Sequence, residues 1–307
     1  MSLLDRFMGQ PDPDSPEAEL IANAALENPP SYVLLFPKAL DLDADALTLA
    51  LQSYHPTLSR AKAELMDVSI DETSPDDVKS VLGLAGWDNH VIKLVGFDAP
   101  IPPQLFETCV RPAHCSPDLK RDALQHESHL LLYYAGRESD PLEQYVALTV
   151  VAAVLARFDA LLLLNENART AFPAEALLAE EPDHDALEML RSMPIPLLYG
   201  GFVKVEVEGE AGVWMRTFGN KMLNLPDLAF RAEGHHQGSE TFDLFANVLA
   251  YVRESGQKLG LGHTMQVGED IWLRLRQPAA DEWHYLHSDG EMFVAERVAA
   301  SDVQVRP

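Results

Sequence analysis

The sequence predicts an α+β protein in two parts: a two-layer α/β sandwich, ferredoxin-like or related, followed by a smaller, strand-rich α+β domain. Three observations support this class. The chain has 307 residues, which is enough for about two domains. Strand-like and helix-like apolar segments alternate over residues 31–175. An acidic stretch containing Pro182 and Pro194 then precedes a region richer in strands. We therefore expect a flexible acidic arm at 1–30, the sandwich domain at 31–175, a linker at 176–195 and the second domain at 196–300.

In the first part, short apolar runs bounded by turn residues predict buried strands, and apolar residues at helical spacing predict the helices between them. The expected strands are 32–36, 63–70, 90–97, 129–134 and 160–164. The expected helices are 43–55, 76–84, 101–110, 118–125 and 141–158. The last of these begins at Pro141 and is apolar nearly all round, so we expect it to be buried. Helices between strands favour a sheet with helices packed on one face.

The second part begins with a cleanly alternating segment, so we expect one face of its sheet to be solvated. The expected strands are 202–207, 213–217, 271–275, 283–287 and 292–298. One amphipathic helix is expected at 241–255, where Gly256 would end it. Asp289 and Gly290 are expected to form the hairpin turn between the last two strands.

The composition excludes several classes of protein. Apolar residues make up 47% of the chain, which disfavours disorder, collagen and small disulfide scaffolds. With 23 Lys and Arg against 48 Asp and Glu, the formal net charge is −25. A basic surface supplies non-specific affinity for nucleic acid and for anionic membranes, so neither is expected as a partner. Acidity chiefly favours solubility, and a basic protein partner is the interaction it would suit.

The ends and the cysteines favour a cytoplasmic protein. The first residues lack the basic start and apolar run of a secretory signal. Arg157 and Asp159 interrupt the most apolar segment, 145–164, so no membrane span is expected. Without an export signal, Cys109 and Cys115 are expected to be reduced thiols.

One set of side chains could hold a metal ion. Thiolate and imidazole groups are the ligands that zinc prefers, and they occur at Cys109, His114, Cys115, His126 and His129. The spacing matches no standard zinc pattern, and the cysteines could equally be small core residues. His126 and His129 also lack the i, i+4 spacing of the H-E-x-x-H signature. No phosphate loop, dinucleotide fingerprint or nucleophile elbow is present, so no catalytic or cofactor-binding residue is assigned.

A resemblance to a known family lies in the second part. The run from Met215 through Thr217 and Gly219 to Pro226, Asp227 and Leu228 resembles the bacterial "domain of unknown function 4261" family. Its features are a Thr-x-Gly turn followed by an apolar segment ending in Pro-Asp-Leu, and the resemblance extends over about 200–277. The segment around 123–129 and the long Ala/Val-rich helix resemble the region that commonly precedes that domain. The resemblance implies an uncharacterised bacterial domain with no established reaction.

Two functional hypotheses follow. The first is a non-catalytic binding or accessory protein, immunity-like in character, whose acidic surface engages a protein partner. The alternative is an enzyme or small-ligand binder with a pocket between the two domains, assisted by zinc at the five Cys and His residues. The absence of catalytic motifs favours the first, although triads are recognised by geometry and not by sequence order. The ligand and the oligomeric state stay open.

Overall fold

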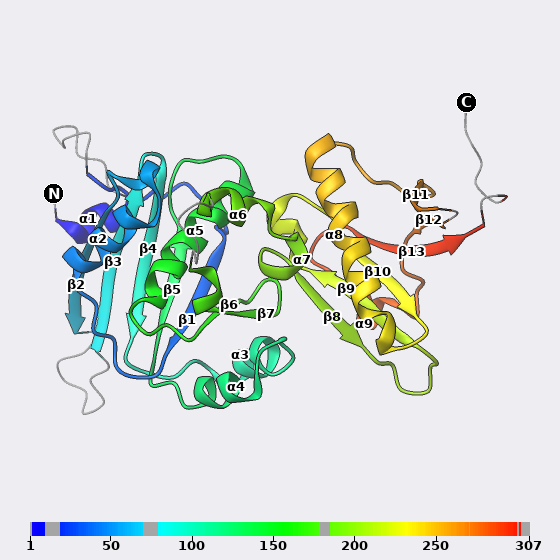
Figure 1. The fold of residues 1–307 in the computed structure, drawn as a ribbon, viewed down its shortest axis with the longest axis horizontal. Helices are drawn as coiled ribbons and strands as arrows, with labels where there is room; N and C mark the ends of the chain where they lie inside the picture. The colour runs from blue at the N-terminus through cyan, green and yellow to red at the C-terminus, as the bar shows by residue number, and fades with distance from the viewer. Residues whose placement is uncertain are drawn as a thin grey trace. The chain divides into compact units, whose positions relative to one another are not determined.

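The computed structural model describes residues 2–9, 19–69, 79–178, 185–269, 271–299 and 301. The chain forms two compact units. The first comprises Met1–Glu166 and Thr170–Met193, and the second comprises Asn167–Arg169 and Pro194–Pro307. Each unit has its own sheet, with helices packed on it, which confirms the α+β class (Figure 1).

The first unit is built on a seven-stranded sheet in the order β2-β3-β4-β5-β1-β6-β7, and every described pairing in it is antiparallel. Its strands are β1 (Ser31–Phe36), β2 (Lys62–Ser69), β3 (Lys79–Trp87), β4 (His90–Phe97), β5 (Ser128–Tyr134), β6 (Leu162–Asn165) and β7 (Thr170–Pro173). The strands expected around 32–36, 63–70, 90–97, 129–134 and 160–164 are all present, although Ile70 lies outside the described residues.

One face of this sheet carries α2 (Ala44–Tyr54), α5 (Pro141–Ala156) and α6 (Ala186–Ser192). Asp140 caps α5 by accepting the Leu142 N–H at 2.9 Å, and Pro141 occupies the first turn, where it needs no donor. Twelve of the sixteen residues of α5 are buried, because the helix lies between the sheet and its neighbours α2 and α6. The expectation of a buried helix is confirmed.

The opposite face is also partly covered. Neighbouring strand residues point to opposite faces, and β1 shows both. The Tyr32 ring lies 5.5 Å from the Tyr145 ring of α5, whereas Val33 and Leu35 pack in one cluster with Cys109. This second cover consists of α3 (Pro103–Leu105), the π-helix η2 (Phe106–Val110) and α4 (Pro117–Leu124). The sandwich therefore has a partial third layer over β1, β6 and β7.

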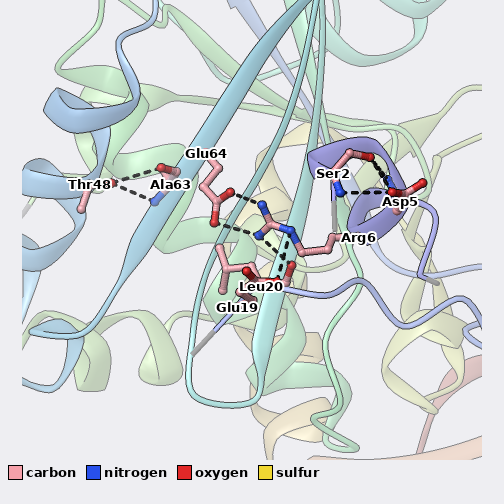
Figure 2. Close-up of polar contacts among 8 residues, drawn as sticks. All are labelled: Ser2, Asp5, Arg6, Glu19, Leu20, Thr48, Ala63 and Glu64. Carbon is pink, nitrogen blue, oxygen red and sulfur yellow. Dashed lines mark hydrogen bonds and ion pairs between the residues drawn. The ribbon is translucent and has the colours of Figure 1, made fainter. Parts of the chain in front are cut away.

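The first residues contain a short helix, α1 (Leu3–Phe7), which an ion pair holds on β2 (Figure 2). The Arg6 side chain is almost fully buried, and its guanidinium binds both carboxylate oxygens of Glu64, with 2.9 Å from Nη1 to Oε1. Nη1 also donates to the carbonyl of Leu20 at 3.4 Å. Residues 2–9 are thus an ordered part of the first unit, whereas Pro11, Pro13 and Pro16 of the expected arm lie outside the described residues.

Replacing Glu64 by glutamine should loosen α1, since the buried guanidinium of Arg6 loses the closer of its carboxylate partners and keeps Glu19, at 3.7 Å. We expect amide hydrogen exchange in residues 2–9 to become about tenfold faster at pH 7. The hydrogen bond from Arg6 lowers the pKa of Glu64, so its contribution is present above the unfolded pKa and is lost as the pH falls through the folded value. As the pH falls and Glu64 becomes protonated, the stability of α1 in the wild-type protein should therefore approach that of the glutamine variant. Glu27→Gln, at an exposed position, is the control, and equal exchange in the two variants would contradict the role of the ion pair.

Two expectations about the first unit need correction or refinement. Residues 79–84, expected to be part of a helix over 76–84, form β3, and 76–78 lie outside the described residues. The physical reason is pairing along the whole strand with both β2 and β4. The described part of 176–195, expected to be a linker, contains α6, whose Ala186, Leu187 and Leu190 are buried.

The second unit has a six-stranded sheet in the order β11-β12-β13-β10-β9-β8, in which β10 and β13 are parallel and the other described pairs are antiparallel. Its strands are β8 (Gly201–Val205), β9 (Val213–Phe218), β10 (Asp227–Ala232), β11 (Thr264–Gly268), β12 (Ile271–Arg276) and β13 (Met292–Val298). Its helices are α7 (Ile195–Leu198), α8 (Gly238–Ser255) and α9 (Trp283–Leu286). As expected, Gly256 ends α8, with φ of +66°.

The strand expected at 283–287 was wrong. Residues 283–286 form the helix α9, and β13 pairs with β10 and β12, so Asp289 and Gly290 do not join a hairpin. The local reason is Glu282, which accepts the Ala279 N–H and binds Arg276 of β12 through two hydrogen bonds of 2.6 and 2.9 Å. That ion pair anchors the start of α9 against the sheet.

Short 3₁₀ turns complete the described elements: η1 (Pro56–Leu58), η3 (Ala174–Leu177), η4 (Asn220–Leu223) and η5 (His235–Gln237). Among the described helices, none combines the length and the apolar character needed to span a membrane.

Candidate functional site

The two cysteines are separate packing residues of the first unit. Cys109 is buried in η2, with its Sγ 3.9 Å from the carbonyl of Asn165, and the half-buried Cys115 has its Sγ 3.9 Å from the carbonyl of Ala171. Neither forms a disulfide. Burial raises the pKa of the Cys115 thiol, which disfavours the thiolate that zinc would need. His114 of the same candidate set is exposed.

The two remaining candidates use their ring nitrogens for structure. The Nε2 atom of His126 accepts the Ile101 N–H at 2.8 Å, so its Nδ1 carries the proton and donates to the carbonyl of Ala123 at 2.7 Å. Burial lowers the pKa of His126, which keeps the ring neutral. His129 contacts the carbonyl of Ala99 through Nδ1 at 2.6 Å. In the described part of the chain, no three His, Cys, Asp or Glu side chains are placed to hold a metal ion.

The Thr-x-Gly and Pro-Asp-Leu segments of the second unit build a buried polar network. The hydroxyl of Thr217 donates to Asp227 Oδ1 at 3.2 Å and accepts the Leu228 N–H at 2.8 Å. Asn220 Nδ2 donates to that hydroxyl at 2.9 Å, and Ser288 donates to Asp227 Oδ2 at 2.5 Å. These contacts join β9, η4 and β10, so they fix where β10 begins.

A buried arginine lies beside this network. Arg216 has no exposed surface; its Nη1 donates to the carbonyl of Tyr285 at 3.0 Å, and its guanidinium lies 3.7 Å from the centre of the Phe218 ring. Burial lowers the pKa of Arg216 to about 10, partly offset by the charge of Asp227. Burial also raises the pKa of Asp227, against the opposing effects of Ser288 and Arg216. Both charged groups are buried, and their hydrogen bonds hold the backbone of β9, η4 and β10 in place, so we call this network the scaffold.

The scaffold supports a groove of about 810 Å³ in the second unit, between α8 and the strands β10–β13. This volume lies within the range of about 300–1,000 Å³ that is common for ligand sites. Its apolar lining comes from β10 to β12 and from one face of α8: Phe230, Leu244, Val248, Tyr251, Met265, Val267 and Ile271. Tyr251 and Ile271 are partly exposed, 54% and 38% respectively, so the groove is open to solvent.

Polar groups surround this apolar lining. At one end, Arg297 of β13 forms an ion pair with Glu240 in the first turn of α8, and its guanidinium lies 5.5 Å from the centre of the Phe230 ring. Asp243 and Asn247 are exposed along α8, and Gln266 is exposed on β11. Among the described residues, the groove lining has carboxylates at Glu240 and Asp243 and hydroxyls at Thr241, Tyr251 and Thr264, but no histidine or cysteine.

Comparison with known proteins bears on this unit. Residues 216–282 match the family model of a domain of unknown function, DUF4261. The expected resemblance of the second part is confirmed, whereas that of 123–129 and the long Ala/Val-rich helix stays a prediction. The DUF4261 match includes Arg216 and Asp227 of the scaffold and most of the groove lining, from Phe230 to Ile271. No curated protein and no solved structure matches the chain.

Sequence reasoning missed this groove, because β10 and β11, which contribute to its lining, were not expected as strands. It also missed a smaller cavity of about 360 Å³ in the first unit, between the β3–β4 turn, η1 and α6. There, His90 Nδ1 lies 3.3 Å from the hydroxyl of Tyr134, and His55 Nε2 lies 3.4 Å from Asp185. Burial lowers the pKa of His90. Both histidines are interspersed among turn residues, and no local motif marks them.

Proposed function

We propose that the chain is a non-catalytic binding protein that holds a segment of a partner protein in the groove between α8 and β11. The observation that carries this proposal is the groove itself, an open, largely apolar channel bordered by a strand at the edge of its sheet. Contiguous exposed apolar surface of this kind is typical of interaction sites. The buried network of Asp227 supports the role by holding β10, which contributes Phe230 to the lining.

Charge supports a basic partner. The net charge of −25 would attract a positively charged protein and speed its association at low salt. Asp243, on the α8 side of the groove, has no ion-pair partner among the described residues. An acidic protein that occupies a basic partner in this way would behave as an immunity-like or accessory protein. Cys109 and Cys115 are not in a disulfide, which favours a reducing compartment, so we place this activity in the bacterial cytoplasm.

The test combines cross-linking with a measured affinity. A photoreactive benzoylphenylalanine in place of Tyr251 should cross-link one protein in the host cell, whereas the same residue in place of the exposed Glu208 should not. The purified cross-linked protein is then titrated against full-length variants by calorimetry. Asn247→Trp, which fills the groove from an exposed position on α8, should weaken binding about tenfold or more.

The matched control is Ser239→Trp, at an exposed position on the same helix outside the groove lining. It should bind the partner as the wild type does. Equal affinities for Asn247→Trp and Ser239→Trp would refute the proposal, because the partner would then be bound elsewhere.

A further inference from the structure

The open border of the groove is a strand with unused backbone groups. β11 lies at the end of the sheet order, and β12 is its sole strand neighbour within the described residues. The Leu275 N–H donates to the carbonyl of His263 at 2.9 Å, and the Leu275 carbonyl accepts the Gly262 N–H at 2.7 Å. The chain is therefore hydrogen-bonded to β12 at this bulge, just before Thr264. Hydrogen-bonded and non-hydrogen-bonded pairs alternate in an antiparallel ladder, so Thr264 and Gln266 direct their backbone N–H and C=O groups away from β12.

The face of α8 on the side of the groove opposite β11 carries four polar or aromatic side chains at helical spacing, and the first and last of them are acidic. Asp243, Asn247, Tyr251 and Glu254 follow one another along α8 at intervals of four, four and three residues, which places them on one face. The first three of them line the groove. In the described part of the chain, neither Asp243 nor Glu254 has an ion-pair partner, whereas Glu240 is paired with Arg297. The uncompensated charge along this face of α8 is therefore negative.

Between these two borders lies an apolar floor that includes Met265, Val267 and Ile271. Long basic side chains suit such a surface, because their methylene stems cover apolar atoms while their charged ends reach carboxylates. Because successive strand residues alternate between faces, the intervening residues of an added strand would lie beside Thr264 and Gln266 on the other face of the sheet. β-Branched side chains fit such a pleated surface. The site thus suits a strand with different chemistry on its two faces.

We propose that the partner segment binds as an added β-strand along β11, with Lys or Arg at alternate positions facing α8 and apolar, β-branched residues between them. This mode uses the outward backbone groups of Thr264 and Gln266 for affinity. Selectivity comes from the carboxylate of Asp243 in the groove lining and from Glu254, which lies beyond the lining on the same face of α8. The inference rests on the proposed function and adds the conformation and charge of the occupant.

The test uses a defined probe with the full-length protein. A fluorescein-labelled seven-residue peptide of alternating lysine and valine is titrated by fluorescence anisotropy, beside the same peptide with glutamate in place of lysine. The lysine peptide should bind the wild type at least about tenfold more tightly. In Asp243→Lys/Glu254→Lys this preference should reverse, while the equally charged control Glu208→Lys/Glu233→Lys, exposed and outside the groove lining, should keep it.

Two N-methylated peptides test strand pairing. Successive residues of a strand direct their N–H groups to opposite edges, so methylating the valine amides blocks one edge and methylating the lysine amides blocks the other. One of the two peptides should lose about tenfold or more in affinity, and the other should bind like the parent. If both bind like the parent, strand addition is overturned, although occupation of the groove stands. If the lysine peptide fails to bind or ignores the charge reversal, the basic occupant is overturned, and the cross-link at Tyr251 independently decides the proposed function.

Discussion

Replacing Asp227 by alanine should lower the free energy of unfolding of the second unit by about 3–5 kcal/mol, the usual cost of leaving a buried charge without its partner. The carboxylate accepts hydrogen bonds from Thr217, Ser288 and the Asn220 N–H. Alanine would leave these buried donors unsatisfied, and Arg216 would lose the nearest compensating charge. Urea titration read by amide hydrogen exchange in β9 and β10 measures the effect in this unit alone.

Asparagine at the same position is the matched variant. Asp227→Asn keeps an acceptor for Thr217 and adds a donor that can reach Ser288, so it should cost less than alanine. Burial raises the pKa of Asp227 in the folded state, so its stabilising contribution is complete below the unfolded pKa and is lost as the pH rises through the folded value. The stability of Asp227→Asn relative to wild type should therefore improve between about pH 4 and pH 7, starting near the usual aspartate pKa. Equal unfolding of the alanine and wild-type proteins would refute the role given to the network.

Replacing Leu148 by alanine should lower the free energy of unfolding of the first unit by about 2–5 kcal/mol. The residues of α5 around Leu148 are all buried, so the space left by the missing side chain is enclosed by packed neighbours. Leu148 is fully buried, in a helix that contacts the sheet, α2 and α6. Loss of its side chain removes apolar contacts and leaves a cavity that three packed elements cannot close. Hydrogen exchange in β1 and β5 measures the loss.

The control is Leu49→Ala, the same substitution on the solvent side of α2, where Leu49 is 64% exposed. Its effect should lie within about 0.5 kcal/mol of zero. A similar cost at both positions would show that α5 is packed loosely enough to relax.

Most of the first unit could be predicted from the sequence because its signals are local. Asp43 caps α2, and Asp140 caps α5 just before Pro141, the residue at which this helix was expected to begin. The apolar residues of β1 and β5 are continuous or regularly spaced, which identifies buried strands. These elements depend on cues within a few residues of themselves.

The elements that were missed or mistaken depend on distant partners. Residues 79–84 contain small and apolar residues compatible with several conformations, and pairing with β2 and β4 decides for a strand. The start of α9 depends on the contact of Glu282 with Arg276, six residues earlier, and Arg276 is itself held in place by the pairing of β12 with the later strand β13. β10 directly follows a turn, and its parallel partner β13 lies more than sixty residues further along the chain. The periodicity of apolar residues within one segment does not indicate which distant strand that segment pairs with.

In the candidate site, too, features marked by a local sequence pattern could be predicted, and features that depend on tertiary packing could not. The Thr217, Gly219 and Asp227 pattern was recognised, and the structure gives it a physical basis in the buried network and in the positive φ of Gly219, +80°. Cys109 and His126 were considered as zinc ligands because of their side-chain chemistry. In the structure, their polar atoms contact backbone carbonyl and amide groups instead. The groove depends on how α8 lies relative to β11, which is a tertiary property.

The position of β13 affects how the second unit can form. This strand lies between β12 and β10, and it is the last strand described along the chain. During synthesis, the pair β11–β12 and the group β10–β9–β8 therefore cannot join into one sheet until β13, which ends at Val298, has left the ribosome. A fragment cut to the family match at 216–282 would lack this strand and β8, leaving four unpaired strand borders open to intermolecular pairing. Because the second unit also includes Asn167–Arg169, a fragment that begins at Pro194 would still lack a segment of this unit.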